Sequence, residues 1–385
     1  MPPPRPNFWE ALFPAPAELG QCVRVEMRLL RKNGRPFLLL PGRPRLAAAT
    51  LDLYPAQTGR ARAARSLLRW FLRASLPLGA ERVSVAASAT DSFVHFLSSL
   101  AGTPTTGLPA LGILAGNPAS EGQRLLLLVF DTRQQPVAVV KAGLSTQAQS
   151  LIEKEASFLK AVPASTMAVP RLRATFESPR LRALALDFFP GDSPRSQDEA
   201  ALPTLLESWL DLNRKVALSG TPDWARLEQT CSNDSLFSVL AQRIRGRAVG
   251  SAIQHGDLAP WNIRISPTGR WTALDWERGE LNGIPGWDWF HYVIQSAILV
   301  ERPPTPALVQ RVETLLHSPA FSQYAVRAGI FDCARELVLA YLLHMVEVIK
   351  PSEGLPPARE LLHALSNRWL PPESTRLTHS THLTL

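Results

Sequence analysis

Cysteine, lysine and long hydrophobic runs are all scarce in this sequence of 385 residues. Its three cysteines, Cys22, Cys231 and Cys333, show neither the C-x-x-C spacing of a zinc site nor the density of a disulfide framework. No stretch approaches the roughly 18 uninterrupted apolar residues that a membrane-spanning helix requires. These absences exclude a disulfide-stabilised mini-protein and a transmembrane protein, and they fit a reducing compartment.

The first residues also lack the features of a secretion signal. Residues 1–20 are rich in proline and contain no apolar segment behind a basic one. We therefore expect a cytoplasmic protein. With 45% hydrophobic and 19% charged residues, the chain can form a sizeable folded interior, and its length predicts two or three packed units.

Positive charge is concentrated near the N-terminus. The formal net charge is +8, and residues 1–110 alone hold 14 basic and 6 acidic side chains. An amphipathic helix is predicted from about residue 56 to 75, and one side of it carries an Arg stripe, defined as Arg62, Arg65, Arg69 and Arg73. This Arg stripe is either a solvated helix face or a docking site for an anionic surface or a partner protein. We expect no nucleic-acid binding, because aromatic and basic residues do not interleave there.

Residues 1–105 are expected to form a basic α/β extension. Apolar and charged residues alternate over 23–29, the period of a half-buried strand, and Asn33-Gly34 provides a tight turn before a second strand at 37–40. A third strand is predicted at 83–87, and the turn-rich segment 101–107 closes the extension.

The rest of the chain divides into a strand-rich part and a helical part. In residues 106–190 we expect an antiparallel meander of three strands, at 108–115, 123–131 and 136–141. A helix at 147–160 and a strand pair at 171–177 and 181–188 follow it. Residues 191–385 are expected to be mainly helical, with periodic segments at 199–218, 236–245, 289–300, 307–317, 334–349 and 358–369. The last dozen residues are expected to fray. The predicted fold class is α+β.

One motif in the helical part carries the chemistry. His255-Gly256-Asp257 is followed by Pro260 and Asn262, and Asp275 comes 13 residues after Asn262. A carboxylate five residues before a carboxamide, with a second carboxylate a hairpin away, suits phosphoryl transfer. In that chemistry one group orients the nucleophile, and carboxylate and amide oxygens hold Mg²⁺.

With these residues the chain resembles the aminoglycoside phosphotransferase and choline kinase-like family, over about residues 108–350. The segments come in the order of that family: a strand ending at Lys141, a helix with Glu155, an apolar segment at 186–191, the catalytic loop, Asp-Trp-Glu, and then Asp288. The resemblance implies a two-lobed protein kinase-like fold, with an antiparallel-sheet small lobe and a mainly helical large lobe. Residues 1–105 would be an addition to it.

The resemblance also implies roles for single residues. Asp257 would be the catalytic base, Asn262 and Asp275 would hold Mg²⁺, and Lys141 would bind the α- and β-phosphates of ATP or GTP. Glu155 would be the ion-pair partner of Lys141. Other implied roles are nucleotide contacts and loop support, from Gly116, Asp187, Phe188, Phe189, His255 and Asp288.

Glu153 is an alternative partner for Lys141. Two positions apart on one helix, Glu153 and Glu155 face different directions. We favour Glu155, because it leaves Ile152, Ala156 and Leu159 as the buried neighbours.

The chain also departs from the family pattern. The expected phosphate-covering segment, 112–122, lacks the G-x-G-x-x-G spacing of protein kinases, which leaves the choice between ATP and GTP open. Trp261 adjoins a predicted metal ligand. It could form an aromatic wall for a sugar or a quaternary ammonium group, or belong to the core, together with Trp276, Trp287 and Trp289.

The sequence therefore predicts a small-molecule kinase that moves the γ-phosphoryl group of a nucleoside triphosphate to a hydroxyl. The acceptor would be a sugar, a polyol, an amino alcohol or an aminoglycoside-like molecule. Residues 251–385 hold 11 basic and 13 acidic side chains, a balance that suits a neutral acceptor better than a polycationic one. The alternative is a catalytically weak kinase-like binding or scaffold protein with a link to surface polysaccharide assembly.

Overall fold

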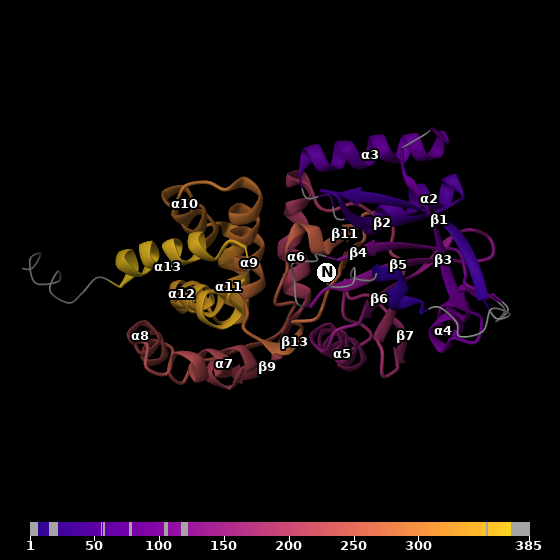
Figure 1. Ribbon diagram of the computed structural model, residues 1–385. Helices are drawn as coiled ribbons and strands as arrows, with labels where there is room; N and C mark the ends of the chain where they lie inside the picture. The colour runs from indigo at the N-terminus through magenta and orange to yellow at the C-terminus, as the bar shows by residue number, and fades with distance from the viewer. Residues whose placement is uncertain are drawn as a thin grey trace, which may run out of the picture. The chain divides into compact units, whose positions relative to one another are not determined.

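The computed structural model describes residues 7–14, 22–54, 56, 58–76, 79–103, 107–116, 122–351 and 353–370 (Figure 1). The chain divides into two compact units. Unit 1 consists of Met1–Pro163, Ala168–Ser193 and Ile263–Glu277. Unit 2 consists of Ala164–Met167, Pro194–Asn262 and Arg278–Leu385.

Unit 1 is built on an eight-stranded sheet. In order across the sheet its strands are β3 (Glu81–Ser88), β1 (Cys22–Lys32), β2 (Arg35–Pro41), β4 (Leu111–Ala115), β5 (Arg124–Phe130), β6 (Pro136–Gly143), β8 (Arg182–Asp187) and β7 (Leu172–Glu177). All neighbouring strands run antiparallel. The predicted hairpin around Asn33-Gly34, the β4–β6 meander and the β7–β8 pair are confirmed.

The strands of the N-terminal region continue the sheet of the predicted small lobe. Leu38 and Leu39 of β2 pair with Leu114 and Ile113 of β4. The boundary predicted near residue 105 therefore falls between two strands of one sheet. The sequence offered no signal for this pairing, because a strand pattern does not name its partner.

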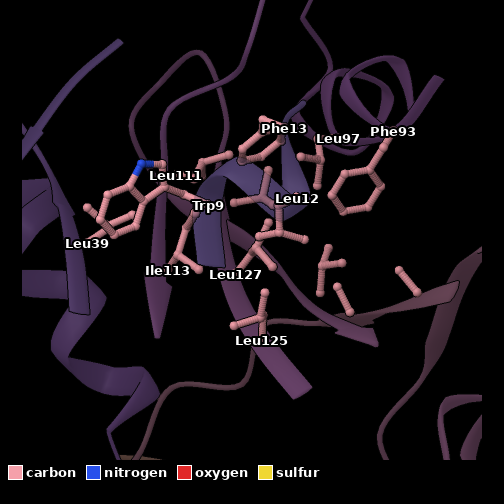
Figure 2. Close-up of a cluster of buried hydrophobic side chains, with 14 of the residues drawn as sticks. Trp9, Leu12, Phe13, Leu39, Phe93, Leu97, Leu111, Ile113, Leu125 and Leu127 are labelled. Atoms are coloured by element: carbon pink, nitrogen blue, oxygen red, sulfur yellow. The ribbon is translucent and has the colours of Figure 1, made fainter. Parts of the chain in front are cut away.

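One face of the unit 1 sheet carries a large apolar cluster. Leu39, Ile113 and Leu127 point to this face, and their neighbours in the chain point to the other, as the period of two requires. Two short helices, α1 (Phe8–Leu12) and α4 (Ser92–Ala101), cover this cluster. Figure 2 shows Trp9 and Leu12 of α1, Phe93 and Leu97 of α4, and Phe13, which follows α1, packed against the strands. The sequence analysis did not predict α1 or α4.

The other face is covered by α2 (Pro44–Thr50) and α3 (Gly59–Arg73), the predicted amphipathic helix (Figure 1). A further helix, α5 (Thr146–Ala161), packs against β6 and β8. Ser145 caps α5 by accepting a hydrogen bond from the Ala148 N–H. Unit 1 also contains the small β11 (Ile263–Ile265) and β12 (Trp271–Ala273) pair, directly before Asp275.

Unit 2 combines a three-stranded antiparallel sheet with eight α-helices among its described residues. Its strands, in sheet order, are β13 (Glu280–Gly283), β10 (Ala248–Gln254) and β9 (Leu210–Ala217). Its helices are α6 (Leu202–Ser208), α7 (Pro222–Cys231), α8 (Ser235–Arg243), α9 (Trp287–Ser296), α10 (Thr305–Leu316), α11 (Pro319–Ala328), α12 (Ala334–His344) and α13 (Leu355–Trp369). The predicted α+β class, with a sheet-based part and a mainly helical part, is confirmed.

Parts of unit 2 differ from the prediction. The helix expected over 199–218 ends at Ser208, and β9 follows. There the hydrogen bonds to β10 outweigh the local helical pattern, since Val216 pairs with Val249. Helices α7 and α11 were not predicted, and the expected fraying of the last dozen residues lies outside the described residues.

In the described part of the chain, no helix has both the length and the apolar character to cross a membrane.

Candidate functional site

A buried ion pair lies at the centre of the candidate site in unit 1. Lys141 Nζ is 2.6 Å from Glu155 Oε1 and 2.7 Å from Oε2, and the two residues are 6% and 0% exposed. Strand β6 directs Lys141 to one face of the sheet, while Val140 and Ala142 join the apolar cluster on the other. Strand β6 thus sets the position of the Lys141 ammonium, and α5 provides the Glu155 carboxylate that pairs with it.

The structure distinguishes the two glutamates of α5. Glu155 faces Lys141 and also accepts a hydrogen bond from the backbone N–H of Trp276, at 3.2 Å. Glu153 is exposed and pairs with Arg182 instead. The buried neighbours of Glu155 on α5 include Ile152, Ala156 and Leu159, as the sequence pattern suggested.

Asp275 completes this group from the chain segment after β12. Its Oδ1 is 2.9 Å from Lys141 Nζ. Its backbone φ is +74°, in the left-handed region that residues with a Cβ seldom occupy. Such a conformation costs about 1–3 kcal/mol and persists where the surroundings enforce it, as often occurs at functional sites. Lys141, Glu155 and Asp275 are therefore brought together within one unit.

Sequence reasoning missed two charged residues beside this group. Arg124, at the start of β5, donates to Asp275 Oδ1 at 3.1 Å and also forms an ion pair with Glu277. The side chains of Arg124 and Glu277 are mostly buried, 20% and 13% exposed. The only signal in the sequence was the proximity of each to a named motif: Arg124 follows the glycine segment, and Glu277 ends Asp-Trp-Glu.

Gly116 lies at the end of β4, where the backbone of β5 approaches closely. A Cβ at Gly116 would be 2.2 Å from the carbonyl oxygen of Arg124, so no larger residue fits without a shift of the backbone. Gln123 donates its side-chain amide to the Gly116 carbonyl at 3.1 Å. The remainder of the predicted phosphate-covering segment, residues 117–121, lies outside the described residues.

The segment predicted to contact adenine follows β8. Asp187 ends the strand, is exposed and lies 3.5 Å from Arg173 in an ion pair. Phe188 donates its backbone N–H to the Val137 carbonyl at 3.3 Å and packs against an apolar cluster. Phe189 is partly exposed, with the guanidinium of Arg270 over its ring. The nucleotide contact of all three residues stays a prediction.

In unit 2, Asp288 supports the predicted catalytic loop. Its carboxylate accepts the backbone N–H groups of His255 at 2.6 Å and Gly256 at 2.9 Å. Burial raises the pKa of Asp288 to about 6, although both backbone hydrogen bonds act to lower it. Gly256 has a φ of +76°, and a Cβ there would be 2.7 Å from the carbonyl oxygen of Arg278. The conformation of the loop therefore depends on the buried Asp288 carboxylate and on the glycine at position 256.

The predicted base, Asp257, is the next residue of that loop. Asn262 donates its side-chain amide to Asp257 Oδ2 at 3.0 Å and to the Asp257 carbonyl at 2.8 Å. On the other side, His291 Nε2 is 3.1 Å and Arg278 Nη1 3.8 Å from Asp257 Oδ1. Burial acts to raise the pKa of Asp257, but His291, Arg278 and His255 together hold it below its ordinary value. Asp257 is therefore an ionised acceptor at neutral pH.

His255 has a structural place in the same loop. It is fully buried, and its Nδ1 accepts the backbone N–H of Asp257 at 3.2 Å. Sequence reasoning named His255, but it did not single out His291, which lies on α9 three residues after Asp288. The spacing of three places His291 on the same helix face as Asp288, which is the signal that could have found it.

The two predicted metal ligands carry side-chain oxygens of the kind that Mg²⁺ prefers, and their binding of a metal stays a prediction. Asp275 and Asn262 offer carboxylate and amide oxygens, the hard donors that Mg²⁺ prefers. In the described part of the chain, no cluster of three or more His, Cys, Asp or Glu residues could hold a metal by itself. Asp275 provides one carboxylate in unit 1, and Mg²⁺ usually binds one or two carboxylates together with substrate phosphates.

Three of the four tryptophans near the motifs belong to the interior. Trp276 is fully buried and stacks on Phe158 of α5, with ring centroids 4.7 Å apart. Trp287 and Trp289 are 2% and 5% exposed and pack among aromatic residues of unit 2. The aromatic-wall interpretation is therefore wrong for these three, and Trp261 alone is partly exposed.

The Arg stripe of α3 is partly used within unit 1. Arg65 donates to Asp192 Oδ1 at 2.5 Å and to the Tyr54 carbonyl at 3.2 Å, and Arg69 pairs with Asp52. Arg73 is exposed and Arg62 half-buried. Two of its four guanidinium groups thus hold unit 1 together, and a docking role for the other two stays a prediction.

Solved structures similar to this chain include two kinds of enzyme. A thermostable mutant of an aminoglycoside phosphotransferase, in a ternary complex with ADP and hygromycin B, is 13% identical; the match covers 73% of this chain and all of that one, with a TM-score of 0.47. A choline kinase from Streptococcus pneumoniae is 13% identical over 71% of this chain and 98% of its own, with a TM-score of 0.43.

An aminoglycoside phosphotransferase from Streptomyces rimosus also matches, with 14% identity over 63% of this chain and 92% of that one, and a TM-score of 0.39. No protein-family model matches the sequence, and neither does any curated protein.

Proposed function

We propose that this protein transfers the γ-phosphoryl group of ATP or GTP to a hydroxyl group of a small molecule. The observation that carries the proposal is the buried Lys141, whose ammonium lies 2.6 Å from Glu155 and 2.9 Å from Asp275. A buried ammonium that is fixed by two carboxylates from different segments is suited to bind the α- and β-phosphates of a nucleotide.

Unit 2 would supply the base. Asp257 would accept the proton of the acceptor hydroxyl while the acceptor oxygen forms a bond to the γ-phosphorus. The bond between that phosphorus and the bridging oxygen breaks, and its electron pair leaves with the nucleoside diphosphate. A loose transition state of this kind demands little basicity. A carboxylate whose pKa lies below its ordinary value is therefore adequate.

Asn262 and Asp275 would hold Mg²⁺, which neutralises phosphate charge when it is bound. His255 and Asp288 would keep the loop in shape through the backbone hydrogen bonds described above. The backbone around Asp187, Phe188 and Phe189 would contact the base of the nucleotide, and Gly116 would lie next to its phosphates. The acceptor would be a neutral sugar, polyol or amino alcohol, or an aminoglycoside-like molecule.

One observation favours a second candidate, a kinase-like binding protein with little turnover. The guanidinium of Arg124 already contacts Asp275, the predicted metal ligand. A permanent cation at that carboxylate would compete with Mg²⁺ and leave nucleotide binding without transfer.

Calorimetry of Mg²⁺-dependent nucleotide binding, followed by a screen for phosphate transfer to hydroxylated metabolites, separates the two candidates. We expect Asp257→Ala to lower turnover by about 10²- to 10⁴-fold while nucleotide binding persists. Asp332→Asn, an exposed acidic residue of unit 2, is the matched control. Nucleotide binding without transfer or hydrolysis in the wild type would favour the binding protein, and unchanged turnover of Asp257→Ala would remove Asp257 as the base.

A further inference from the structure

His291 is a buried titratable group next to the predicted base, and the proposed function assigns no role to it. It lies on α9, is 2% exposed, and its Nε2 is 3.1 Å from Asp257 Oδ1. Its other ring nitrogen, Nδ1, is 3.0 Å from the hydroxyl of Tyr341 on α12. Three side chains from the loop, α9 and α12 therefore form a continuous chain, Asp257–His291–Tyr341, within unit 2.

Tyr341 determines the direction of this chain. Burial raises the pKa of Tyr341 well above its ordinary value, so the phenol keeps its proton. A buried phenol normally satisfies its O–H with a hydrogen bond. His291 Nδ1 is its hydrogen-bond partner among the described residues. When the phenol donates to Nδ1, the ring proton of a neutral imidazole must be on Nε2, the nitrogen that faces Asp257.

The opposite tautomer is electrostatically unfavourable. It would direct the Nε2 lone pair at a carboxylate oxygen 3.1 Å away, in a buried place where such repulsion is weakly screened. In the described part of the chain, Nε2 has no aligned hydrogen-bond partner. The nearby Asp257 oxygen, at 3.1 Å, is within hydrogen-bond distance of Nε2.

The contacts of Asp257 indicate how the Nε2–H of His291 would act on its carboxylate. Asn262 donates to Oδ2 at 3.0 Å, and His291 Nε2 lies 3.1 Å from Oδ1, so a side-chain nitrogen contacts each carboxylate oxygen. Each oxygen has two lone pairs, which leaves acceptor capacity for the hydroxyl of a substrate. A carboxylate with a donor on each side would have a fixed orientation, and orientation is the main demand of phosphoryl transfer.

We propose that His291 is a positioning residue that holds a proton at Nε2 against Asp257, and that Tyr341 fixes the tautomer in which it does so. The proposal rests on the proposed function, because it assigns a task in the use of Asp257 as base. His291 does not take the proton of the acceptor; it keeps its own proton and orients the carboxylate that takes it.

The first test examines the tautomer itself and needs no activity. ¹⁵N chemical shifts of labelled histidine in the full chain identify the protonated ring nitrogen, and the signal that is lost in His291→Gln assigns His291. We expect protonation at Nε2 alone in the wild type, and a loss of this preference in Tyr341→Phe. A ring protonated at Nδ1, or at both nitrogens, would overturn the tautomer assignment, as would a spectrum that Tyr341→Phe leaves unchanged.

The second test uses two amides that imitate different ring nitrogens. The side-chain nitrogen of Gln lies near the position of Nε2, and that of Asn lies near Nδ1. We expect His291→Asn to lower kcat by about 10- to 100-fold, with the KM for nucleotide changed by less than about 2-fold, because the lost interaction orients a base rather than binds substrate. We expect His291→Gln to recover most of that loss.

Thermal unfolding of both variants accompanies the kinetics, and His363→Gln, an exposed histidine on α13, is the control. Equal losses in the Gln and Asn variants at equal stability would refute the positioning role, and so would a change confined to KM. If the wild type transfers no phosphate, the proposed function fails, and the ¹⁵N experiment still decides whether Tyr341 and Asp257 fix the ring.

Discussion

The ammonium of Lys141 lies between the carboxylates of Glu155 and Asp275, at 2.6 and 2.9 Å, and Glu155 is fully buried. A buried charge is costly unless it is paired, so the removal of one partner should harm the fold as well as the nucleotide site. Three elements of unit 1 meet at this point: β6, α5 and the segment that follows β12.

We expect Glu155→Gln to lower the free energy of unfolding by about 3–5 kcal/mol, because Lys141 would lose its principal buried counter-charge. The matched control is Glu153→Gln on the same helix. Glu153 is 60% exposed, and we expect its loss to cost less than about 1 kcal/mol. Urea titration followed by circular dichroism measures both variants. Similar costs for the two substitutions would contradict the importance of the buried pair.

Arg124 should oppose the binding of a divalent cation in the absence of nucleotide. It shares Asp275 with Lys141, and its charge lies 3.1 Å from the oxygen that a metal would need. We expect Arg124→Gln to strengthen Mn²⁺ binding to the nucleotide-free protein by about 3- to 10-fold, measured by electron paramagnetic resonance. Arg133→Gln, in the exposed turn before β6, should change nothing. Weaker Mn²⁺ binding in Arg124→Gln would instead indicate that Arg124 keeps Asp275 in its binding conformation.

Asp223 should control part of the acid sensitivity of unit 2. Burial acts to raise the pKa of this carboxyl, but the neighbouring His344 and Arg226 hold it down at about 2. Because the folded pKa lies below the ordinary value of 3.8, the stabilisation is complete above about pH 4 and is lost as the pH falls toward 2. Over that range the wild type should lose about 2 kcal/mol more than Asp223→Asn.

Urea unfolding at several pH values between 2 and 5 measures this difference, with Asp332→Asn as an exposed control. Parallel stability curves for the wild type and Asp223→Asn would show that this carboxyl titrates normally in the folded protein.

Arg65 should contribute more to the stability of the fold than Arg73, the exposed member of the Arg stripe. Its side chain is 10% exposed and binds Asp192 and the Tyr54 carbonyl. We expect Arg65→Ala to lower the free energy of unfolding by about 1–3 kcal/mol, since the packing of a mostly buried side chain and its hydrogen bonds are lost. Arg73→Ala, at the exposed end of α3, should lie within about 0.5 kcal/mol of the wild type. Equal effects of Arg65→Ala and Arg73→Ala in thermal unfolding would show that Arg65 contributes no more to stability than an exposed side chain.

Much of the fold could be predicted because its signals are local. The alternation over β1 and the Asn33-Gly34 turn specify a hairpin within a few residues, and the periodicity of α5 specifies which side is buried. β9 could not be predicted in this way, because its residues form a strand only through hydrogen bonds to β10, which lies about thirty residues further along the chain. The attachment of β2 to β4 was hidden for the same reason.

The candidate site shows a similar division. The motif around Asp257 and the choice of Glu155 over Glu153 were accessible from spacing and helix geometry alone. Arg124, Glu277 and His291 were not, since each meets its partner from a distant part of the chain. A sequence determines by itself those features that depend on neighbours a few residues away: strands, caps, glycine-dependent turns and the motif that carries the chemistry. Which distant charges share one buried space is decided by the tertiary structure, because only folding removes water from between them and makes their interaction strong.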